Sequence, residues 1–231
     1  MSELPIALHI PDGFLSTEVA LAAWLPALAA VAFALRVAGR QLDDERVPLL
    51  GLLAAFLFAM QMLTFPVAGG TSGHLMGAAL AAVLLGPWLA CLVMTVVLGA
   101  QAFLFADGGI TALGANIVVM GIIGALLAGL VFGRAQRAVP STRPVFLGLV
   151  GAVSWAAVML GAATTAILLG VSDTVPLGTA LAAMLGVHAL IGIGEAVITV
   201  AAVSAVLASR PDLLSFRPAE AHPAPGRVQE A

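Results

Sequence analysis

The composition of this 231-residue chain is that of an integral membrane protein. It is 61% hydrophobic and 9% charged, with a formal net charge of −3 and a mean hydropathy of +1.13. Soluble domains carry roughly a quarter charged residues, so a chain this apolar needs lipid as its solvent. The single cysteine, Cys91, excludes a disulfide framework and a four-cysteine metal site, and we expect no nucleic-acid partner.

The amino-terminal stretch is the first feature along the chain. Residues 1–8 have neither a basic region nor an apolar core of about 7–15 residues, so they predict no signal peptide. Residues 8–16 then place His9, Pro11 and the dipeptide Asp12-Gly13 directly before the first long apolar run. Proline followed by Asp-Gly favours a sharp turn of the chain ahead of the first helix.

Seven apolar runs follow, and a transmembrane helix needs roughly 20 such residues. The third run is short and is parted from the fourth by Gly86-Pro87, so we do not expect it to cross the bilayer alone. Turn and charged residues gather in the breaks between the runs. The sequence predicts an all-α polytopic membrane protein, a bundle of about seven transmembrane helices in one domain over residues 1–208. The runs are 17–38, 48–66, 74–86, 88–106, 110–133, 144–170 and 177–208.

The basic residues give an orientation. With seven crossings, the first loop, the fifth loop and the tail share one side, and the positive-inside rule makes that side cytoplasmic. Residues 209–231, which are polar and proline-rich, are expected to be a disordered cytoplasmic tail. The amino terminus and the loop at 69–73 then face outward. All nine basic residues fall in or beside those three segments: Arg36, Arg40, Arg46, Arg134, Arg137, Arg143, Arg210, Arg217 and Arg227.

Two histidines on the outer side form a candidate metal pair. His9 follows the amino terminus, and His74 ends the glycine-rich break at 69–73. Imidazole is suited to nickel, copper, cobalt and zinc. Two histidines make an incomplete site, so further ligands must come from the backbone, the amino terminus, carboxylates or water. Purely structural histidines remain the alternative.

Other polar residues in the apolar runs are candidates for support of that pair. His188 and Glu195 are seven residues apart and share a helix face. Ionisable residues at membrane depth are costly and mark functional sites. These two could add ligands, but we favour a role in holding the bundle or a ligand in place. Asn116 could orient a ligand or bond across helices.

Residues beside the histidines could hold their rings or loops. The glycines before His74 let the backbone approach closely. Thr71 and Ser72 could fix this loop or bond the ring nitrogen opposite the metal. Asp12 could do the same for His9, or it could cap the turn after Pro11.

An enzyme of another class is the alternative function. Gly70-Thr71-Ser72-Gly73 matches the GxSG motif of rhomboid intramembrane serine proteases. Ser72 would be the nucleophile and His188 the base. Four such residues are common in any loop, and His74 has no part in that mechanism.

Longer stretches carry a resemblance to a known family. Together with residues 8–16, the chain resembles the CbiM/NikM family, the substrate-binding membrane subunits (S components) of energy-coupling-factor (ECF) transporters for cobalt and nickel. The resemblance spans residues 8 to about 200. Its further motifs are residues 65–75, Gly86-Pro87-Trp88, residues 101–109, residues 111–116 and residues 188–196.

The resemblance implies a specific metal site. The amino-terminal segment would fold back into the outer side of a seven-helix bundle. The ligands would be a terminal amine, the backbone nitrogen and imidazole of a histidine matching His9, and a second imidazole matching His74. Four nitrogens in a plane suit Ni²⁺ and accommodate Co²⁺. Geometry has to do the selecting, since copper binds more strongly to such ligands.

The resemblance also implies partners. A transmembrane coupling (T) subunit, two cytoplasmic ATP-binding subunits and commonly a small membrane accessory subunit would form an ATP-driven complex in the bacterial cytoplasmic membrane. The chain itself has no GxxxxGK[ST] phosphate loop. We therefore expect a transporter subunit and not an enzyme, with Ni²⁺ or Co²⁺ as cargo and no permanent cofactor.

One departure from the family concerns the amine. The family places methionine directly before the histidine, whereas Leu8 precedes His9 and seven residues precede Leu8. Our hypothesis is that translation starts at the Leu8 codon with methionine. Alternatively the extension is real, and a carboxylate or water replaces the amine with a weaker preference for nickel. A third function, an S component for an organic vitamin, would need neither histidine.

Overall fold

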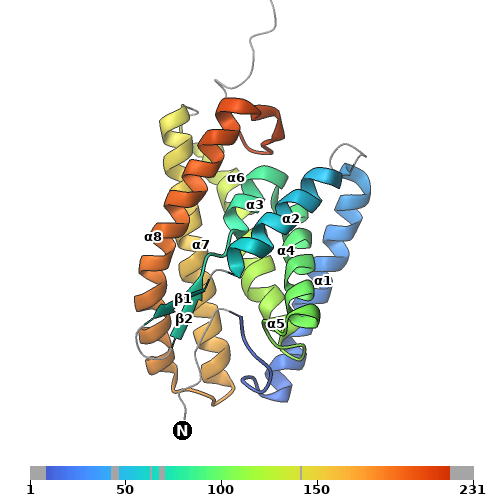
Figure 1. The fold of residues 1–231 in the computed structure, drawn as a ribbon, viewed down its shortest axis with the longest axis vertical. Helices are drawn as coiled ribbons and strands as arrows, with labels where there is room; N and C mark the ends of the chain where they lie inside the picture. The colour runs from blue at the N-terminus through green and yellow to red at the C-terminus, as the bar shows by residue number, and fades with distance from the viewer. Residues whose placement is uncertain (1–8, 43–46, 63, 68–70, 141, 219–231) are drawn as a thin grey trace, which may run out of the picture.

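The computed structural model describes residues 9–42, 47–62, 64–67, 71–140 and 142–218. These residues form a bundle of helices and one short antiparallel hairpin (Figure 1). Segments α5, η1 and α6 make one continuous helix, of which η1 is π-helical. The helices are α1 (Thr17–Gln41), α2 (Val47–Gln61), α3 (Ala78–Leu85), α4 (Pro87–Leu104), α5 (Leu113–Asn116), η1 (Ile117–Leu127), α6 (Ala128–Ala138), α7 (Arg143–Val171), α8 (Leu177–Ser209) and the 3₁₀ turn η2 (Pro211–Leu213); the strands are β1 (Thr64–Val67) and β2 (Thr71–His74).

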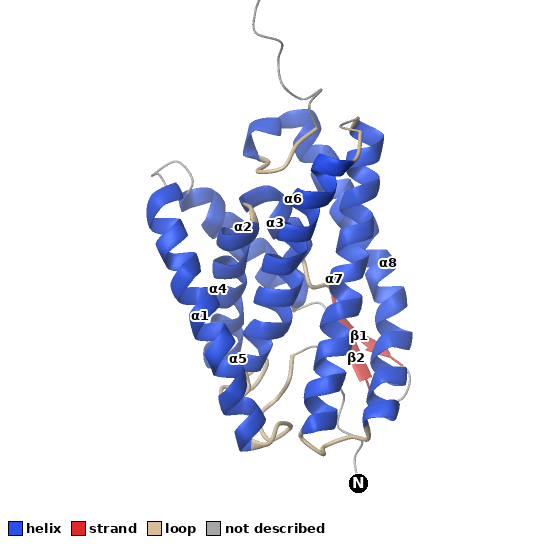
Figure 2. Cartoon of the chain, turned by 180° about the vertical axis from the view of Figure 1, so that it is seen from behind, coloured by secondary structure: helices blue, strands red, loops and turns tan. Residues whose placement is uncertain are grey.

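Five helices of the described chain are long and apolar enough to cross a membrane. They are α1, α4, the continuous helix α5–η1–α6, α7 and α8, and they lie side by side in both views (Figures 1 and 2). The shorter α2, with 15 residues, spans about 22 Å at 1.5 Å per residue. The all-helical character predicted from the apolar runs is confirmed, apart from the hairpin.

The hairpin between α2 and α3 is a correction to the sequence analysis. The second run, predicted as helical to residue 66, ends as helix at Gln61, and the third begins as helix at Ala78 instead of residue 74. Thr64 pairs with His74, and Val67 pairs with Thr71. The physical reason is local, because proline within 64–67 and glycine within 71–74 disfavour a helix and suit a short strand pair.

Small residues let the helices approach one another. In α1 the buried positions are all alanine, spaced three, four or seven residues apart, while leucines of the same helix point outward. Interfaces of this kind are typical where lipid tails replace water and close packing drives association. The buried alanines are Ala20, Ala23, Ala27, Ala34 and Ala38.

Helix α3 is short and buried along all eight residues. At its carboxyl end the chain returns after α8, where Ser215 N and Phe216 N donate to Val83 O at 3.1 and 3.2 Å. Phe216 also packs on Phe132 of α6, with ring centroids 5.2 Å apart.

The predicted disorder of residues 209–231 is therefore wrong for residues 209–218, the first of which ends α8. Leu214 is buried, and Gln136 Nε2 donates to Arg217 O at 2.7 Å. Leu214 and the half-buried Phe216 pack against the bundle, and the backbone of this stretch supplies donors to the end of α3. Residues 219–231 lie outside the described part of the chain.

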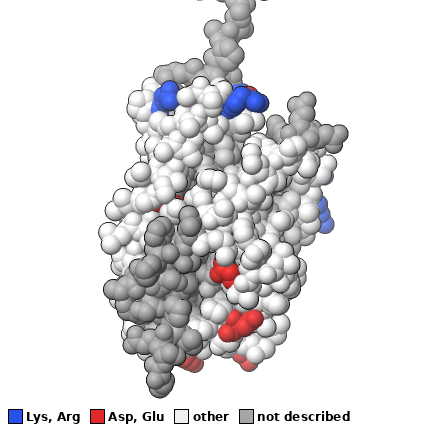
Figure 3. Space-filling model, viewed as in Figure 1, with Lys and Arg blue, Asp and Glu red and all other residues white. Residues whose placement is uncertain are grey.

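Charge is divided between the two ends of the bundle. Arginines follow or end α1, α6 and α8 and begin α7, and Figure 3 shows basic side chains at the upper end of the bundle and on its right edge. Most acidic groups of the described chain lie toward the opposite end, where α1 begins and α7 meets α8.

Candidate metal site

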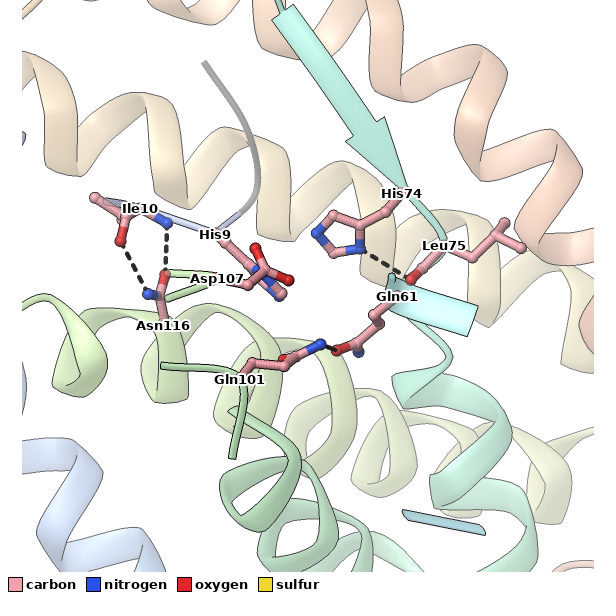
Figure 4. A network of polar contacts seen from close by, with 8 residues as sticks. All are labelled: His9, Ile10, Gln61, His74, Leu75, Gln101, Asp107 and Asn116. Carbon is pink, nitrogen blue, oxygen red and sulfur yellow. Dashed lines mark hydrogen bonds and ion pairs between the residues drawn. The ribbon is translucent and has the colours of Figure 1, made fainter. Parts of the chain in front are cut away.

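Two histidines from distant parts of the chain meet inside the acidic half of the bundle. His9 lies on the segment before α1, and His74 is the last residue of β2. Their ring centroids are 4.4 Å apart and the rings are tilted by 52°, as Figure 4 shows. His9 is 4% exposed and His74 is 3% exposed. The structure thus brings together the two residues that the sequence singled out.

Hydrogen bonds define which nitrogen of each ring carries the proton. His9 Nδ1 lies 3.0 Å from Asp107 Oδ1, and His74 Nδ1 lies 3.0 Å from Leu75 O. A carboxylate and a carbonyl only accept, so Nδ1 donates in each case. Neutral rings then carry the lone pair on Nε2, and both Nε2 atoms are buried without a hydrogen-bond partner among the described residues. Metal-binding histidines show this pattern, with the other N–H bonded to a carboxylate or carbonyl.

The charged group beside the two histidines is Asp107, in the loop between α4 and α5. The hydrogen bond from His9 holds the pKa of Asp107 below its usual range. Asp107 therefore stays an anion that fixes the His9 ring. A neutral imidazole is the form that binds a metal.

Asp107 is a residue that the sequence analysis missed. It lies in the loop between α4 and α5, within the motif at 101–109 that carried the family resemblance. Its charge and its adjoining glycines were visible, but its partner His9 is 98 residues away. Only the fold shows that this carboxylate, and not Asp12, orients the ring.

Asn116 fastens the segment that carries His9. Its Oδ1 accepts from Ile10 N at 2.8 Å, and its Nδ2 donates to Ile10 O at 3.1 Å. Ile10 O also accepts from Gly109 N at 2.9 Å. The Asn116 side chain thus pairs with Ile10 much as a neighbouring strand would, and Ile10 is only 1% exposed.

Asp12 anchors the same segment two residues after Ile10. Its Oδ1 accepts from Thr111 N at 2.7 Å and from Thr111 Oγ1, and its Oδ2 accepts from Ile110 N at 3.1 Å. The hydroxyl of Thr111 is the main cause that lowers the pKa of Asp12. A Cβ at Gly109 would collide with the backbone of Asp12, so the contact requires glycine there. Asp12 bonds the loop before α5 and does not bond the His9 ring.

The backbone after His74 is held from α8. Glu195 Oε2 accepts from Met76 N at 2.8 Å, and its Oε1 accepts from Gly77 N at 2.6 Å. These amides directly precede the amino-terminal end of α3, where a carboxylate is favourable. Glu195 thus fixes the segment between His74 and α3, and its side chain is 2% exposed.

Two glutamines complete the support and were also missed from sequence. Gln61 Nε2 donates to Met76 O at 2.6 Å. Gln101 Nε2 donates to Gln61 Oε1 at 3.0 Å, as Figure 4 shows. Both glutamines are 0% exposed. Each lies within an otherwise apolar run, and an amide at such a position was the available signal.

Three further candidates from the sequence are His188, Thr71 and Ser72. His188 is fully buried on α8, and its Nδ1 lies 2.7 Å from Met184 O. The side chains of Thr71 and Ser72 lie outside the described part of the structure. Among the residues that are described, no three His, Cys, Asp or Glu side chains form a group that could hold a metal ion.

The fold and this site define a class, multi-pass membrane proteins of metal transport, and comparison with known proteins agrees. Residues 9–213 match the profile of the CbiM family, described as the cobalt uptake substrate-specific transmembrane region. The chain belongs to this family. The resemblance seen in the sequence is thereby confirmed.

The relatives include proteins named for nickel transport and proteins named for cobalt transport. The chain is 35% identical over 232 residues to the fused nickel transport protein NikMN of Rhodobacter capsulatus, covering 94% of this chain and 66% of the relative. It is 35% identical over 206 residues to the cobalt transport protein CbiM of Sorangium cellulosum, covering 81% of this chain and 86% of the relative. The crystal structure of a truncated transition metal transporter superposes with a TM-score of 0.79 at 31% identity, covering 87% of this chain and 98% of that one.

The comparisons support a component of cobalt or nickel transport and give the rhomboid protease alternative no support. The relatives are transport proteins in name, which agrees with a transporter subunit in place of an enzyme.

Proposed function

We propose that this chain is the substrate-binding membrane subunit of an ECF-type transporter, which captures Ni²⁺ or Co²⁺ at the external face for ATP-driven uptake. One observation carries the proposal. His9 and His74 are buried against each other, and in each ring Nδ1 is bonded while Nε2 has no partner in the described chain. Two neutral imidazoles prepared in this way are suited to a divalent transition metal.

The rest of the ligand set would come from the main chain. We propose that the amino-terminal segment folds into the outer side of the bundle and supplies nitrogen from before His9. The backbone nitrogen of His9 itself could bind the same ion only together with Nδ1, which bonds Asp107 here. The bonds of Ile10 with Asn116 and of Asp12 with Thr111 support this placement. A translation start at the Leu8 codon would put a free amine next to His9, and a start at Met1 would require another ligand there.

We further propose seven passages through the membrane, with the amino terminus outside and the carboxyl terminus inside. Five helices have the necessary length. The other two passages would combine α2 with β1 and β2 with α3. The arginine-rich end of the bundle supports a cytoplasmic placement of that end (Figure 3).

Partners follow from this assignment. A transmembrane T subunit and two cytoplasmic ATP-binding subunits would drive uptake, commonly with a small membrane accessory subunit. Membership of a family described as the substrate-specific region of cobalt uptake supports the division of labour. The bacterial cytoplasmic membrane is the proposed location, and Ni²⁺ or Co²⁺ is cargo.

The test is native mass spectrometry of the protein, expressed from its own upstream DNA and purified after growth with both metals. We expect one bound Ni²⁺ or Co²⁺ per chain, and the same spectrum reports the mass of the true amino terminus. His74→Ala should lose the metal while the bundle stays folded by circular dichroism. Stoichiometric metal in that variant would defeat the ligand assignment. His222→Ala, which changes a histidine outside the described residues, is the matched control and should keep the metal.

A further inference from the structure

Two buried glutamines connect the two segments that hold the histidines. Gln61 is the last residue of α2, and its Nε2 donates to Met76 O at 2.6 Å. Met76 follows His74 by two residues, so this bond fixes the segment that carries the second histidine. On its other side, Gln61 Oε1 accepts from Gln101 Nε2 of α4 at 3.0 Å (Figure 4).

From Gln101 the contacts lead to the other histidine. The main-chain oxygen of Gln101 accepts from Asp107 N at 3.0 Å, and Asp107 Oδ1 lies 3.0 Å from His9 Nδ1. The circuit closes at the site itself, where the ring centroids of His9 and His74 are 4.4 Å apart. The glutamine pair is therefore a bridge between the segment after His74 and the α4–α5 loop that holds His9.

Stability alone does not account for an amide pair at this position. Both side chains are 0% exposed, and Gln101 Oε1 has no hydrogen-bond partner among the described residues. An unpaired buried acceptor costs free energy that two apolar side chains of similar shape would avoid. What the amides add is direction, because a hydrogen bond holds its two groups within a narrow range of distance and angle.

The separation of the histidines matters because metals differ in the geometry that they require. The ligands of a metal site must be held within about 0.5 Å of their productive positions. Selection between first-row metals comes from geometry and ligand type more than from raw affinity. Zn²⁺ has no geometric preference from its d electrons, so it tolerates a displaced ligand better than Ni²⁺ or Co²⁺ does.

We propose that Gln61 and Gln101 are positioning residues, which set the separation of His9 and His74 and thereby the preference of the site for Ni²⁺ or Co²⁺ over Zn²⁺. This inference rests on the function proposed above and deepens it. Neither glutamine needs to touch the cation, because the bridge acts on both histidine-bearing segments through bonds to their main chain.

The test is the double variant Gln61→Leu/Gln101→Leu. Removing both amides leaves no unpaired partner within the pair, and such a replacement can be nearly neutral, so we expect the bundle to stay folded by circular dichroism. Leucine also adds no ligand atom. Isothermal titration of the tag-free, detergent-solubilised protein measures the Kd for Ni²⁺, Co²⁺ and Zn²⁺. We expect Ni²⁺ and Co²⁺ to bind about 10–100-fold more weakly, whereas the Kd for Zn²⁺ should change by less than about threefold.

The two single variants test whether the glutamines act as one bridge. Gln61→Leu and Gln101→Leu each interrupt the same circuit, so each should shift the ratio of the Kd values as far as the double variant does. Residues that act through one another show this non-additive behaviour. Two smaller shifts that add up in the double variant would contradict a single bridge.

Ser154→Ala/Thr199→Val is the matched control. Ser154 on α7 and Thr199 on α8 are also buried, and their hydroxyl oxygens lie 3.3 Å apart. This pair joins two other helices, so its removal should leave the Kd of all three metals within about twofold of the parent.

Titration of the parent and of the double variant separates this inference from the function on which it rests. An equal loss of affinity for all three metals in the folded double variant, or no loss for any, would overturn the inference and leave the proposed function intact. A parent that binds Zn²⁺ as tightly as Ni²⁺ and Co²⁺ would also overturn it, and this comparison needs no variant to fold. No binding of Ni²⁺ or Co²⁺ by the parent would overturn the proposed function itself.

Discussion

Asn116→Ala is the perturbation whose size follows most directly from the structure. It deletes the bonds of 2.8 and 3.1 Å between the Asn116 side chain and Ile10. Ile10 O keeps Gly109 N as a donor, whereas Ile10 N is left buried and unpaired. A lost neutral bond costs about 1 kcal/mol and an orphaned buried donor about 1–3 kcal/mol, so docking of the segment weakens by about 2–4 kcal/mol.

That loss converts to affinity through the docked population. If the metal binds only when the amino-terminal segment is docked, the apparent Kd rises as that population falls. At 1.4 kcal/mol per factor of ten, the loss of about 2–4 kcal/mol corresponds to binding that is at most about 30- to 700-fold weaker. The assay is isothermal titration of the detergent-solubilised protein with Ni²⁺ and Co²⁺.

The matched control is Gln136→Ala at the opposite end of the bundle. Gln136 is also an amide that bonds a main-chain carbonyl, that of Arg217 at 2.7 Å, and its removal should leave the metal Kd unchanged. A Kd within about twofold of wild type in Asn116→Ala, with metal still lost in His74→Ala, would refute the docking argument, because such docking is expected to act through the populated fraction.

Two further predictions concern the residues around the site. Asp107→Asn removes the anion that orients His9 and should weaken metal affinity about 10–100-fold in the same titration. Glu195→Gln keeps the shape of the side chain but replaces one of its two accepting oxygens by an N–H₂ group, which then faces a backbone N–H donor. The variant should lose about 2 kcal/mol of stability in thermal unfolding. Full wild-type stability of this variant would show that the carboxylate is not needed.

The sequence predicted those features of the fold and the site that depend on the type of residue at a position and not on its partners. Long apolar runs predicted the helices, because a helix in lipid must satisfy its backbone internally. His74 drew attention because an ionisable group is rare in such runs, and His9 because it lies with Pro11 and Asp12-Gly13 directly before the first run. Glycine and proline around 64–77 marked a break, but the choice between loop and hairpin depended on pairing across that break, such as Thr64 with His74.

The parts that were missed depend on contacts between distant residues. Asp107 meets His9 across 98 residues, and Gln101 meets Gln61 across 40. Nothing near either residue in the chain identifies its partner. The carboxyl-terminal stretch was misjudged for a similar reason, because the donors of Ser215 and Phe216 find their acceptors on α3. Composition alone could not show that these residues complete the end of a buried helix.

Helix α3 is tied at both ends, and this restricts how the site can change. The amides of Met76 and Gly77 directly before it bond Glu195, and the carbonyls of Val83 and Leu84 in its last turn accept from the returning chain. All eight of its residues are buried, so no water is at hand to replace a broken bond. The helix is about 12 Å long at 1.5 Å per residue. Any displacement of the His74 loop along this axis must therefore also disturb Ser215 and Phe216 at the arginine-rich end, so the two faces of the bundle share a single mechanical element.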